Sequence, residues 1–498
     1  MSPMSSQWPK GGWLALVMVA GCATAPRTVE VPGLSDAGLP WTRTAPPPSL
    51  PSVPFVEPPA HEVTLPNGLR VVVIERHERP IVATRLLLRA GAAVESDERA
   101  GITWLSLAAL EDRVELKTSD DELLVSDEKS ARRQLADLGG RMDFEVTHDG
   151  SWIGVEGYSV DTLRYLEALR DVMKARRHGA GGFGDRREAL LDAIEDLELG
   201  DDETLSEHLA RLAFGARHVY ARRVIGTMAS LDHLGIEDLV AHQNAVLQPR
   251  GATLLVVGDV DHAKVLTQAA SVFQKWTPTT GSVVEPPIEV PKVGKRQAVR
   301  VIPRTPARTT ALCGVRGLGD VTESDAALDV FAETMGSDRL RSALREERGL
   351  TYGTQALVLR HRRARALIFC ARLPTAQTTE GLVVFVHALE GLRASPPSDE
   401  EVERAKATLQ SRFAVERSDV QGIVASWTRA VQLGKPTGVG EARQALAAVT
   451  TAELAKLSRE VLAPERLQLV LTGETATIEE AVKAAGLGKS VTIRVAHE

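Results

Sequence analysis

The same order of predicted elements occurs twice along this chain, and that repetition limits the folds open to it. In the first copy, two β-rich runs in "EVTLPNGLRVVVIERH" flank a Pro-Asn-Gly turn signal, and "IVATRLLLRAGA" predicts another strand. A helical segment follows, then the strands of "FEVTHDGSWIGVEGY" and the helical spacing of "DTLRYLEALRDVMKA". The apolar run "ATLLVVGDV" predicts the closing strand of this half.

The second copy repeats this plan after a Pro-rich linker. Strands are predicted in "RTTALCGVRG", "GTQALVLRHRRARALIFCARL" and "RLQLVLTG", and helices in "DAALDVFAETM" and "TEGLVVFVHALEGL". A period of about 230 residues is far longer than a solenoid repeat and indicates a tandem pair of domains. We therefore predict an α+β fold class with two tandem homologous α/β domains. Pattern alone leaves open that two unrelated α+β domains share this plan.

The amino terminus predicts export. Lys10 precedes an apolar run of about ten residues, too short to span a bilayer, that ends in small residues. Its end, Val19-Ala20-Gly21-Cys22, resembles a bacterial lipobox, in which Cys22 becomes the lipidated first residue; the alternative is an ordinary cleaved signal. Ala23 rather than Asp follows, so we expect a lipid-anchored protein of the cell envelope, at the outer membrane and facing the periplasm.

These signals divide the chain into five predicted parts. They are a signal peptide (1–22), a Pro-rich tether (23–58), an N-terminal domain (59–275), a linker (276–295) and a C-terminal domain (296–490). The net charge of -7 is mild and the basic residues are dispersed among acids, so we exclude nucleic acid as a partner. We expect membrane contact only through the lipid anchor.

Several segments together resemble the pitrilysin/insulinase family of zinc metallopeptidases, in its short-chain bacterial, mitochondrial-processing-peptidase-like branch. They are "GITWLSLAAL", "LADLGGRMDF", "RREALLDAIEDLE", "RHVYARRVIGTMASLDHLGIEDLVAHQNAVLQPRGATLLVVGDV" and "LRSALREERGLTYGTQ". "EEVERAKATL" near Glu401 is also similar to the family. The resemblance runs from about His61 to Gly473 and implies a duplicated half-clamshell, with each half a peptidase-like domain.

The zinc motif of that family is missing here. Active members carry His-x-x-Glu-His on the helix after the third strand, which places two ligands and a general base on one face, and a Glu on a later helix completes the site. The resemblance places these positions at Trp104, Leu107, Ala108 and Ala193. No two of the 12 His are four residues apart, so a shift of register cannot restore the motif. We predict that this chain binds no metal and has no catalytic residue of its own.

The second half keeps a different family motif, "LREERGLTY". The resemblance implies that Arg348 and Tyr352 contact the substrate backbone near the scissile carbonyl, a role that suits two hydrogen-bond donors. The alternative is structural, with Arg348 paired to Glu346 or Glu347 and Tyr352 packed at the start of a strand. In the first half, the segment "GGRMDFEVTHDGSWIGVEGY" resembles the Gly-Gly element and edge strand along which the family adds substrate peptides, although Asp143 replaces the usual Asn.

Three functions follow as hypotheses. The first is a non-catalytic subunit of a two-chain zinc metallopeptidase, which binds peptide substrate beside a zinc-bearing subunit of the same family. The second is a catalytically inactive binding or structural protein with the peptidase fold. The third, an active metallopeptidase with an unusual site, is disfavoured by the lost ligands.

Two smaller features complete the sequence analysis. The glycine-rich stretch from Gly179 to Asp185 predicts a loop. Cys313 and Cys370 lie in predicted strands, where they either form a disulfide or remain buried free thiols.

Overall fold

The computed structural model describes most of the chain from residue 58 onward. The described residues are 58–111, 116–117, 123–124, 135–174, 180–198, 201–277, 288–291, 298–319, 324–435, 439–463, 467–488 and 490–492. The predicted signal peptide, its Cys22, the tether up to residue 57 and much of the linker lie outside these ranges. In the part of the chain that is described, no helix has both the length and the apolar character needed to cross a bilayer.

The first half is built on a six-stranded mixed sheet with the order β1-β2-β8-β3-β7-β6. Its strands are β1 (Ala60–Thr64), β2 (Arg70–Glu75), β3 (Ile81–Leu88), β6 (Arg141–Val146), β7 (Ser151–Tyr158) and β8 (Thr253–Gly258). The apolar runs of β2 and β8 pair in parallel at the centre, where strands are buried on both faces. The short strands β4 (Leu116–Lys117) and β5 (Leu123–Leu124) form a separate ladder.

The second half repeats five strands of this topology in the order β11-β12-β10-β13-β9-β14. The sixth strand differs, because β14 pairs in parallel with β9 whereas β1 pairs antiparallel with β2. Its strands are β9 (Ala298–Pro303), β10 (Thr309–Gly317), β11 (Thr354–Arg360), β12 (Arg365–Pro374), β13 (Gln468–Gly473) and β14 (Ser490–Thr492). The predicted fold class of two tandem α/β domains is confirmed. Sequence analysis missed β9, which pairs in parallel with β13 as β2 does with β8.

Helices surround both sheets. Those of the first half are α1 (Ile102–Glu111), α3 (Thr162–Lys174), α4 (Ala180–Glu198), α5 (Asp201–Phe214), α6 (Met228–Asp232), α7 (Ile236–Val246) and α8 (His262–Phe273). Those of the second are α9 (Asp325–Glu333), α10 (Thr378–Ala394), α11 (Asp399–Glu416), α12 (Val420–Leu433), α13 (Val439–Ala448), α14 (Thr451–Val461) and α15 (Thr475–Ala484). Short 3₁₀ turns are η1 (Ala92–Val94), η2 (Asp97–Arg99), η3 (Ser159–Asp161), η4 (Val219–Ala221) and η7 (Thr375–Gln377).

The prediction of a loop at the glycine-rich stretch was wrong, because α4 already begins at Ala180. Gly181, Gly182 and Gly184 near its start disfavour a helix, but Phe183 and Leu190 pack with α1 in a buried cluster. Tertiary packing of that apolar face therefore outweighs the local preference for a turn.

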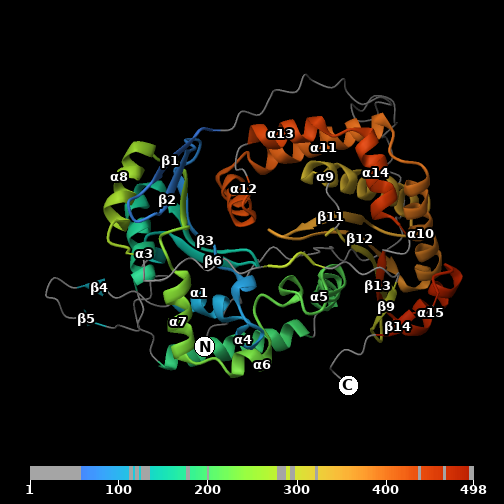
Figure 1. Cartoon of the computed structure of the whole chain (residues 1–498), viewed down its shortest axis with the longest axis horizontal. Helices are drawn as coiled ribbons and strands as arrows, with labels where there is room; N and C mark the ends of the chain where they lie inside the picture. Colours follow the sequence, from blue (N-terminus) through green and yellow to red (C-terminus); the bar gives the residue numbers. More distant parts are fainter. Residues whose placement is uncertain are drawn as a thin grey trace, which may run out of the picture.

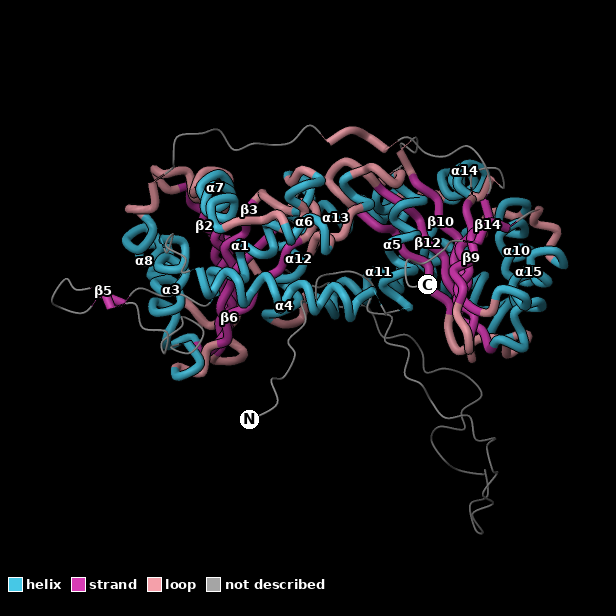
Figure 2. The backbone as a smooth tube through the Cα atoms, turned by 90° about the horizontal axis from the view of Figure 1, so that it is seen from below, coloured by secondary structure: helices cyan, strands magenta, loops and turns pink. Residues whose placement is uncertain are grey.

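One helix of each half packs on the sheet of the other half. Helix α12, from the second half, packs Ile423, Val424 and Trp427 onto the first sheet. Helix α5, from the first half, packs Leu209 and Phe214 onto the second sheet. Figure 1 shows α12 beside the first sheet and α5 beside the second, and Figure 2 shows the strands in two groups along the molecule. The two halves therefore share their cores.

A buried polar cluster joins the halves at the hairpin between β11 and β12. Tyr220 Oη donates to Asp149 Oδ1 at 2.7 Å, and His361 Nδ1 lies 3.2 Å from Asp149 Oδ2. Arg362 Nη2 donates to the carbonyl oxygens of Asp149 and Gln432, at 2.9 and 2.8 Å. Burial opposes ionisation of Asp149, but the hydrogen bonds from His361 and Tyr220 hold its pKa below the ordinary value. A charged, fully bonded carboxylate thus fastens the hairpin between β11 and β12 to the first half.

Cys313 and Cys370 form a disulfide between β10 and β12. They are direct partners in the strand register, and their Cα atoms are 4.2 Å apart. The disulfide alternative of the sequence analysis therefore holds in this structure, and the free-thiol alternative does not.

We expect Trp427→Ala to lower the free energy of unfolding by about 3–5 kcal/mol, because it removes a large side chain from the core shared by the halves. Trp427 is 3% exposed and packs against the first sheet. The control is Val415→Ala on α11, where the side chain is 69% exposed and the change should stay within about 0.5 kcal/mol. Urea unfolding followed by circular dichroism measures both; equal effects of the two variants would contradict the shared core.

Candidate functional site

Helix α1 carries three of the positions where the resemblance places the zinc motif, and their side chains are packed. Leu107 and Ala108 are each 1% exposed, and Trp104 is partly buried. The indole of Trp104 meets the ring of Phe144 on β6 edge to face, with centroids 5.3 Å apart. None of these side chains offers a lone pair that suits zinc. The face that would hold a metal is instead part of the core.

The fourth position, Ala193, lies on α4, which packs against α1. Ile102, Leu105 and Ala109 of α1 form a buried cluster with Leu190 and Ile194 of α4. The two helices are therefore adjacent, as the motif requires, but the side chains between them are apolar. Among the described residues, no group of three or more His, Cys, Asp or Glu is arranged to hold a metal ion. The residues of this site do not fit zinc.

Glu95 was not singled out from the sequence, although it fixes the start of α1. Its two carboxylate oxygens accept the backbone N–H groups of Gly101 and Thr103, each at 2.8 Å. Burial raises the pKa of Glu95 to about 7, against the effect of these N–H groups. Gly101 has a φ of +93°, a left-handed conformation that favours glycine. The "GITWLSLAAL" stretch is thus a rigid structural element.

Arg348 and Tyr352 lie in the second half and face solvent. They follow two π-helical segments, η5 (Thr334–Leu340) and η6 (Ser342–Glu346). Arg348 Nη1 lies 3.2 Å from Glu347 Oε2 and 3.4 Å from the carbonyl oxygen of Ala343. Tyr352 is 75% exposed, so it does not serve as packing at the start of β11. Of the structural alternative, the pairing of Arg348 is seen and the packing of Tyr352 is not.

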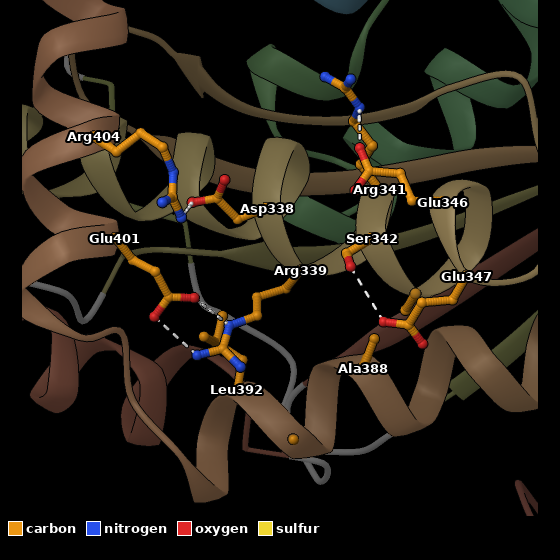
Figure 3. A pocket seen from close by; sticks show the side chains of 12 residues that line it. Asp338, Arg339, Arg341, Ser342, Glu346, Glu347, Ala388, Leu392, Glu401 and Arg404 are labelled. Carbon is orange, nitrogen blue, oxygen red and sulfur yellow. Dashed lines mark hydrogen bonds and ion pairs between the residues drawn. The ribbon is translucent and has the colours of Figure 1, made fainter. Parts of the chain in front are cut away.

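A charged pocket beside this segment shows how it is held. Its volume is about 620 Å³, and it lies between η5, η6, α10 and the start of α11. Arg339 Nη2 donates to Glu401 Oε2 at 3.0 Å, and Arg404 Nη2 donates to Asp338 Oδ2 at 3.2 Å (Figure 3). Glu401 also accepts the N–H of Ser398 and so caps α11. The "EEVERAKATL" segment therefore clamps the π-helical region that precedes Arg348.

The two groups of predicted residues lie in different halves of the chain. Trp104 and Leu107 of α1 pack in core clusters of the first half, whereas Leu350, between Arg348 and Tyr352, packs in the core of the second. Strand β6 lies at the edge of the first sheet, as the resemblance predicts. There Asp143 Oδ1 accepts the N–H of Phe144 at 3.0 Å, and its other oxygen lies 3.2 Å from Arg141.

Comparisons with known proteins support the same family. Residues 233–409 match a family model described as "Peptidase M16 inactive domain". The chain is 24% identical over 230 residues to a probable mitochondrial-processing peptidase subunit beta from Arabidopsis thaliana, a match that covers 45% of this chain and 41% of that protein. It is 22% identical over 404 residues to an uncharacterized zinc protease from Mycobacterium leprae, covering 80% of this chain and 88% of that protein.

Solved structures agree in fold. A protease from Helicobacter pylori superposes with a TM-score of 0.74 at 16% identity, covering 84% of this chain and 100% of that chain. A peptidase M16 inactive domain from Pseudomonas fluorescens has a TM-score of 0.70 at 18% identity, covering 84% of this chain and 98% of that chain. The chain spans less than half of the Arabidopsis relative, so activity does not transfer from these names.

We expect the purified chain to retain well below one zinc ion per molecule after dialysis, because a protein zinc site needs about three ligands and the matched positions offer none. Metal analysis by mass spectrometry measures this. The control is a relative with an intact His-x-x-Glu-His motif, which should keep its zinc under the same dialysis. Tightly held zinc at one ion per chain would contradict the assignment of α1.

Glu95 should make stability depend on pH. The pKa of Glu95 is about 7 in the folded state and about 4.3 in the unfolded state, so the folded state binds the proton more tightly. Proton binding by Glu95 therefore adds to the unfolding free energy at low pH, and this stabilisation is lost as pH rises from about 4.3 to about 7. Relative to Glu95→Gln, the wild type should lose on the order of 2 kcal/mol between these pH values. Urea unfolding at several pH values measures the difference. The exposed control Glu98→Gln should show no such loss, and a pH-independent difference for Glu95→Gln would contradict the expectation.

Proposed function

We propose that this chain, which has the fold of the M16 peptidases and matches their inactive domain over residues 233–409, is the non-catalytic subunit of a two-chain zinc metallopeptidase. Its partner would be a zinc-bearing subunit of the same family, and the pair would cleave peptides in the cell envelope. This chain contributes substrate-binding residues, and the metal belongs to the partner.

The observation that carries the proposal is the contrast between the two motifs. The metal face of α1 has become core, with Leu107 and Ala108 buried. In the second half, Tyr352 remains 75% exposed although burial would be the ordinary use of an aromatic ring. An exposed phenol and an exposed guanidinium thus lie on one short segment of the second half.

The chemistry of Arg348 and Tyr352 suits recognition of a peptide carbonyl. Both side chains are hydrogen-bond donors, and a donor aimed at a developing oxyanion stabilises the transition state of acyl transfer. The pair of Arg348 with Glu347 is between exposed side chains, and such pairs contribute little to stability. Arg348 can therefore exchange that partner for substrate at small cost.

Strand β6 supports binding of an extended peptide. It is an edge strand, so one side of its backbone has no partner within the sheet. Peptides add to such edges by main-chain hydrogen bonds, largely without regard to sequence. The Trp104–Phe144 pair lies directly at this strand and replaces the metal there with an apolar surface.

The cell-envelope location rests on two supports. The lipobox-like sequence ending at Cys22 predicts export and lipidation. The disulfide between Cys313 and Cys370 suits an oxidising compartment, because such bonds are rare in the cytosol.

The alternative is a binding or structural protein with no part in cleavage. The observation in its favour is that Arg348 already contacts Glu347 and the Ala343 carbonyl group. The two functions differ in what happens when only the phenol oxygen of Tyr352 is removed.

We expect Tyr352→Phe to lower kcat of the two-chain enzyme by as much as ~10²-fold while the complex stays intact, because one donor to the oxyanion is lost. The chain is co-expressed with a zinc-bearing relative, the complex is co-purified, and peptide cleavage is measured. The matched control is Tyr158→Phe, an exposed tyrosine of the first half, which should leave kcat unchanged. Failure to co-purify with any zinc-bearing relative, or full activity of Tyr352→Phe, would favour the binding protein.

A further inference from the structure

A second pocket lies at one end of the second sheet, on the face that α5 covers. Its floor is a row of residues on three neighbouring strands. Ala311 of β10 pairs directly with Arg372 of β12 on one side and with Thr472 of β13 on the other. Directly paired residues point to the same face of a sheet, so the small Ala311 side chain leaves space between Arg372 and Thr472. Leu205 of α5 forms a wall.

The lining of this pocket is strongly basic. The pocket has a volume of about 250 Å³, and its polar lining is supplied by Arg304, Thr305, Arg308, Thr309, Arg372 and Thr472. Three arginines and three threonines thus line one small space, and none of the described lining residues is acidic. Arginine binds phosphate and carboxylate through paired charge-assisted hydrogen bonds.

The loop that forms the rim is fixed at both ends. The N–H of Arg304 donates to the carbonyl oxygen of Gly473 at 2.9 Å. At the other end, the N–H of Thr375 donates to the carbonyl oxygen of Arg308 at 3.0 Å, and its hydroxyl donates to that of Ala307 at 2.7 Å. The rim therefore needs little ordering on binding, which favours affinity.

Thr472 provides an independent sign of a ligand. It is 5% exposed, and its hydroxyl oxygen has no hydrogen-bond partner among the described residues. Leaving a buried hydroxyl group unsatisfied is unfavourable, and valine would fill the same shape without that group. A ligand oxygen in the pocket would complete the bonding of this hydroxyl group.

The first half shows that the fold does not require this chemistry. The corresponding row there is Glu156 of β7, Ala83 of β3 and Val257 of β8. The central alanine is the same, but an acid stands in place of Arg372 and valine in place of Thr472. Within this duplicated scaffold, the combination of arginine and threonine in this row therefore occurs in the second half and not in the first.

We propose that this pocket binds a small dianionic oxyanion, either free phosphate or a phosphate monoester. A dianion matches three guanidinium groups better than a single carboxylate does, and its oxygens can accept from both arginine and threonine donors. The pocket is lined by neither Arg348 nor Tyr352, and its proposed ligand does not depend on the proposed function.

Isothermal titration of the full purified chain tests the proposal at constant ionic strength. The probes are inorganic phosphate, glycerol phosphate as a monoester, and acetate as a monocarboxylate. We expect saturable one-site binding of phosphate, of the monoester or of both, and much weaker binding of acetate. Binding of only one of the two phosphate probes would identify whether the ligand is free or esterified.

Two variants locate the site. Arg308→Gln removes a charge from an exposed rim residue, and Thr472→Val removes only the buried hydroxyl group; each should raise Kd by about tenfold or more. The control is Arg79→Gln, an exposed arginine in the corresponding loop of the first half, which should bind as the wild type does. Thermal unfolding without ligand verifies that each variant folds. If Thr472→Val does not fold, the phosphate affinity of Arg308→Gln alone decides the test. Absence of saturable phosphate binding, equal binding of acetate, or wild-type affinity in Arg308→Gln would overturn the proposal.

Discussion

The exchange of helices α5 and α12 between the two sheets is the constraint on which the rest of this structure depends. Each sheet has its own helices on one face and takes the cover of its other face from the opposite half. Separation of the halves would expose both apolar faces to water, at a cost that grows with the area uncovered. Any motion of the two halves must therefore keep α5 and α12 in place. The hydrogen bonds of the Asp149 cluster also fix the orientation of the hairpin between β11 and β12 relative to the first half.

The apolar side chains at the matched positions of α1 are also explained by packing. A helix that binds zinc must keep polar side chains on a face that points into a cavity, which costs stability unless the metal is present. In α1 that face has become Trp104, Leu107 and Ala108, joined to the core and to Phe144 of β6. The helix is held at its start by Glu95. In the first half, α1 is thus held by apolar packing and by Glu95, and β6 remains an edge strand.

Most of the strands and the helices α1, α3, α9 and α10 could be predicted from the sequence, because apolar periodicity and turn signals are local. The glycine-rich start of α4 was mispredicted, since its helix depends on Phe183 packing against residues distant in sequence. Periodicity also cannot show which sheet a helix covers, so the crossing of α5 and α12 was not foreseen. The exposure of Tyr352 and the role of Glu95 depend on tertiary contacts. The row of Arg372, Ala311 and Thr472 depends on strand register, which residue composition does not fix.

The two halves share a topology but differ in what they place on it. In the first half, the position of a metal site is filled by apolar side chains, and the row through Ala83 carries an acid. In the second half, Arg348 and Tyr352 face solvent, and the row through Ala311 carries arginine and threonine. Since the scaffold tolerates either set, fold stability does not explain these side chains. The exposed donors and the arginines and threonines of the pocket lie in the second half, whereas the edge strand β6 and the pocket wall at Leu205 belong to the first.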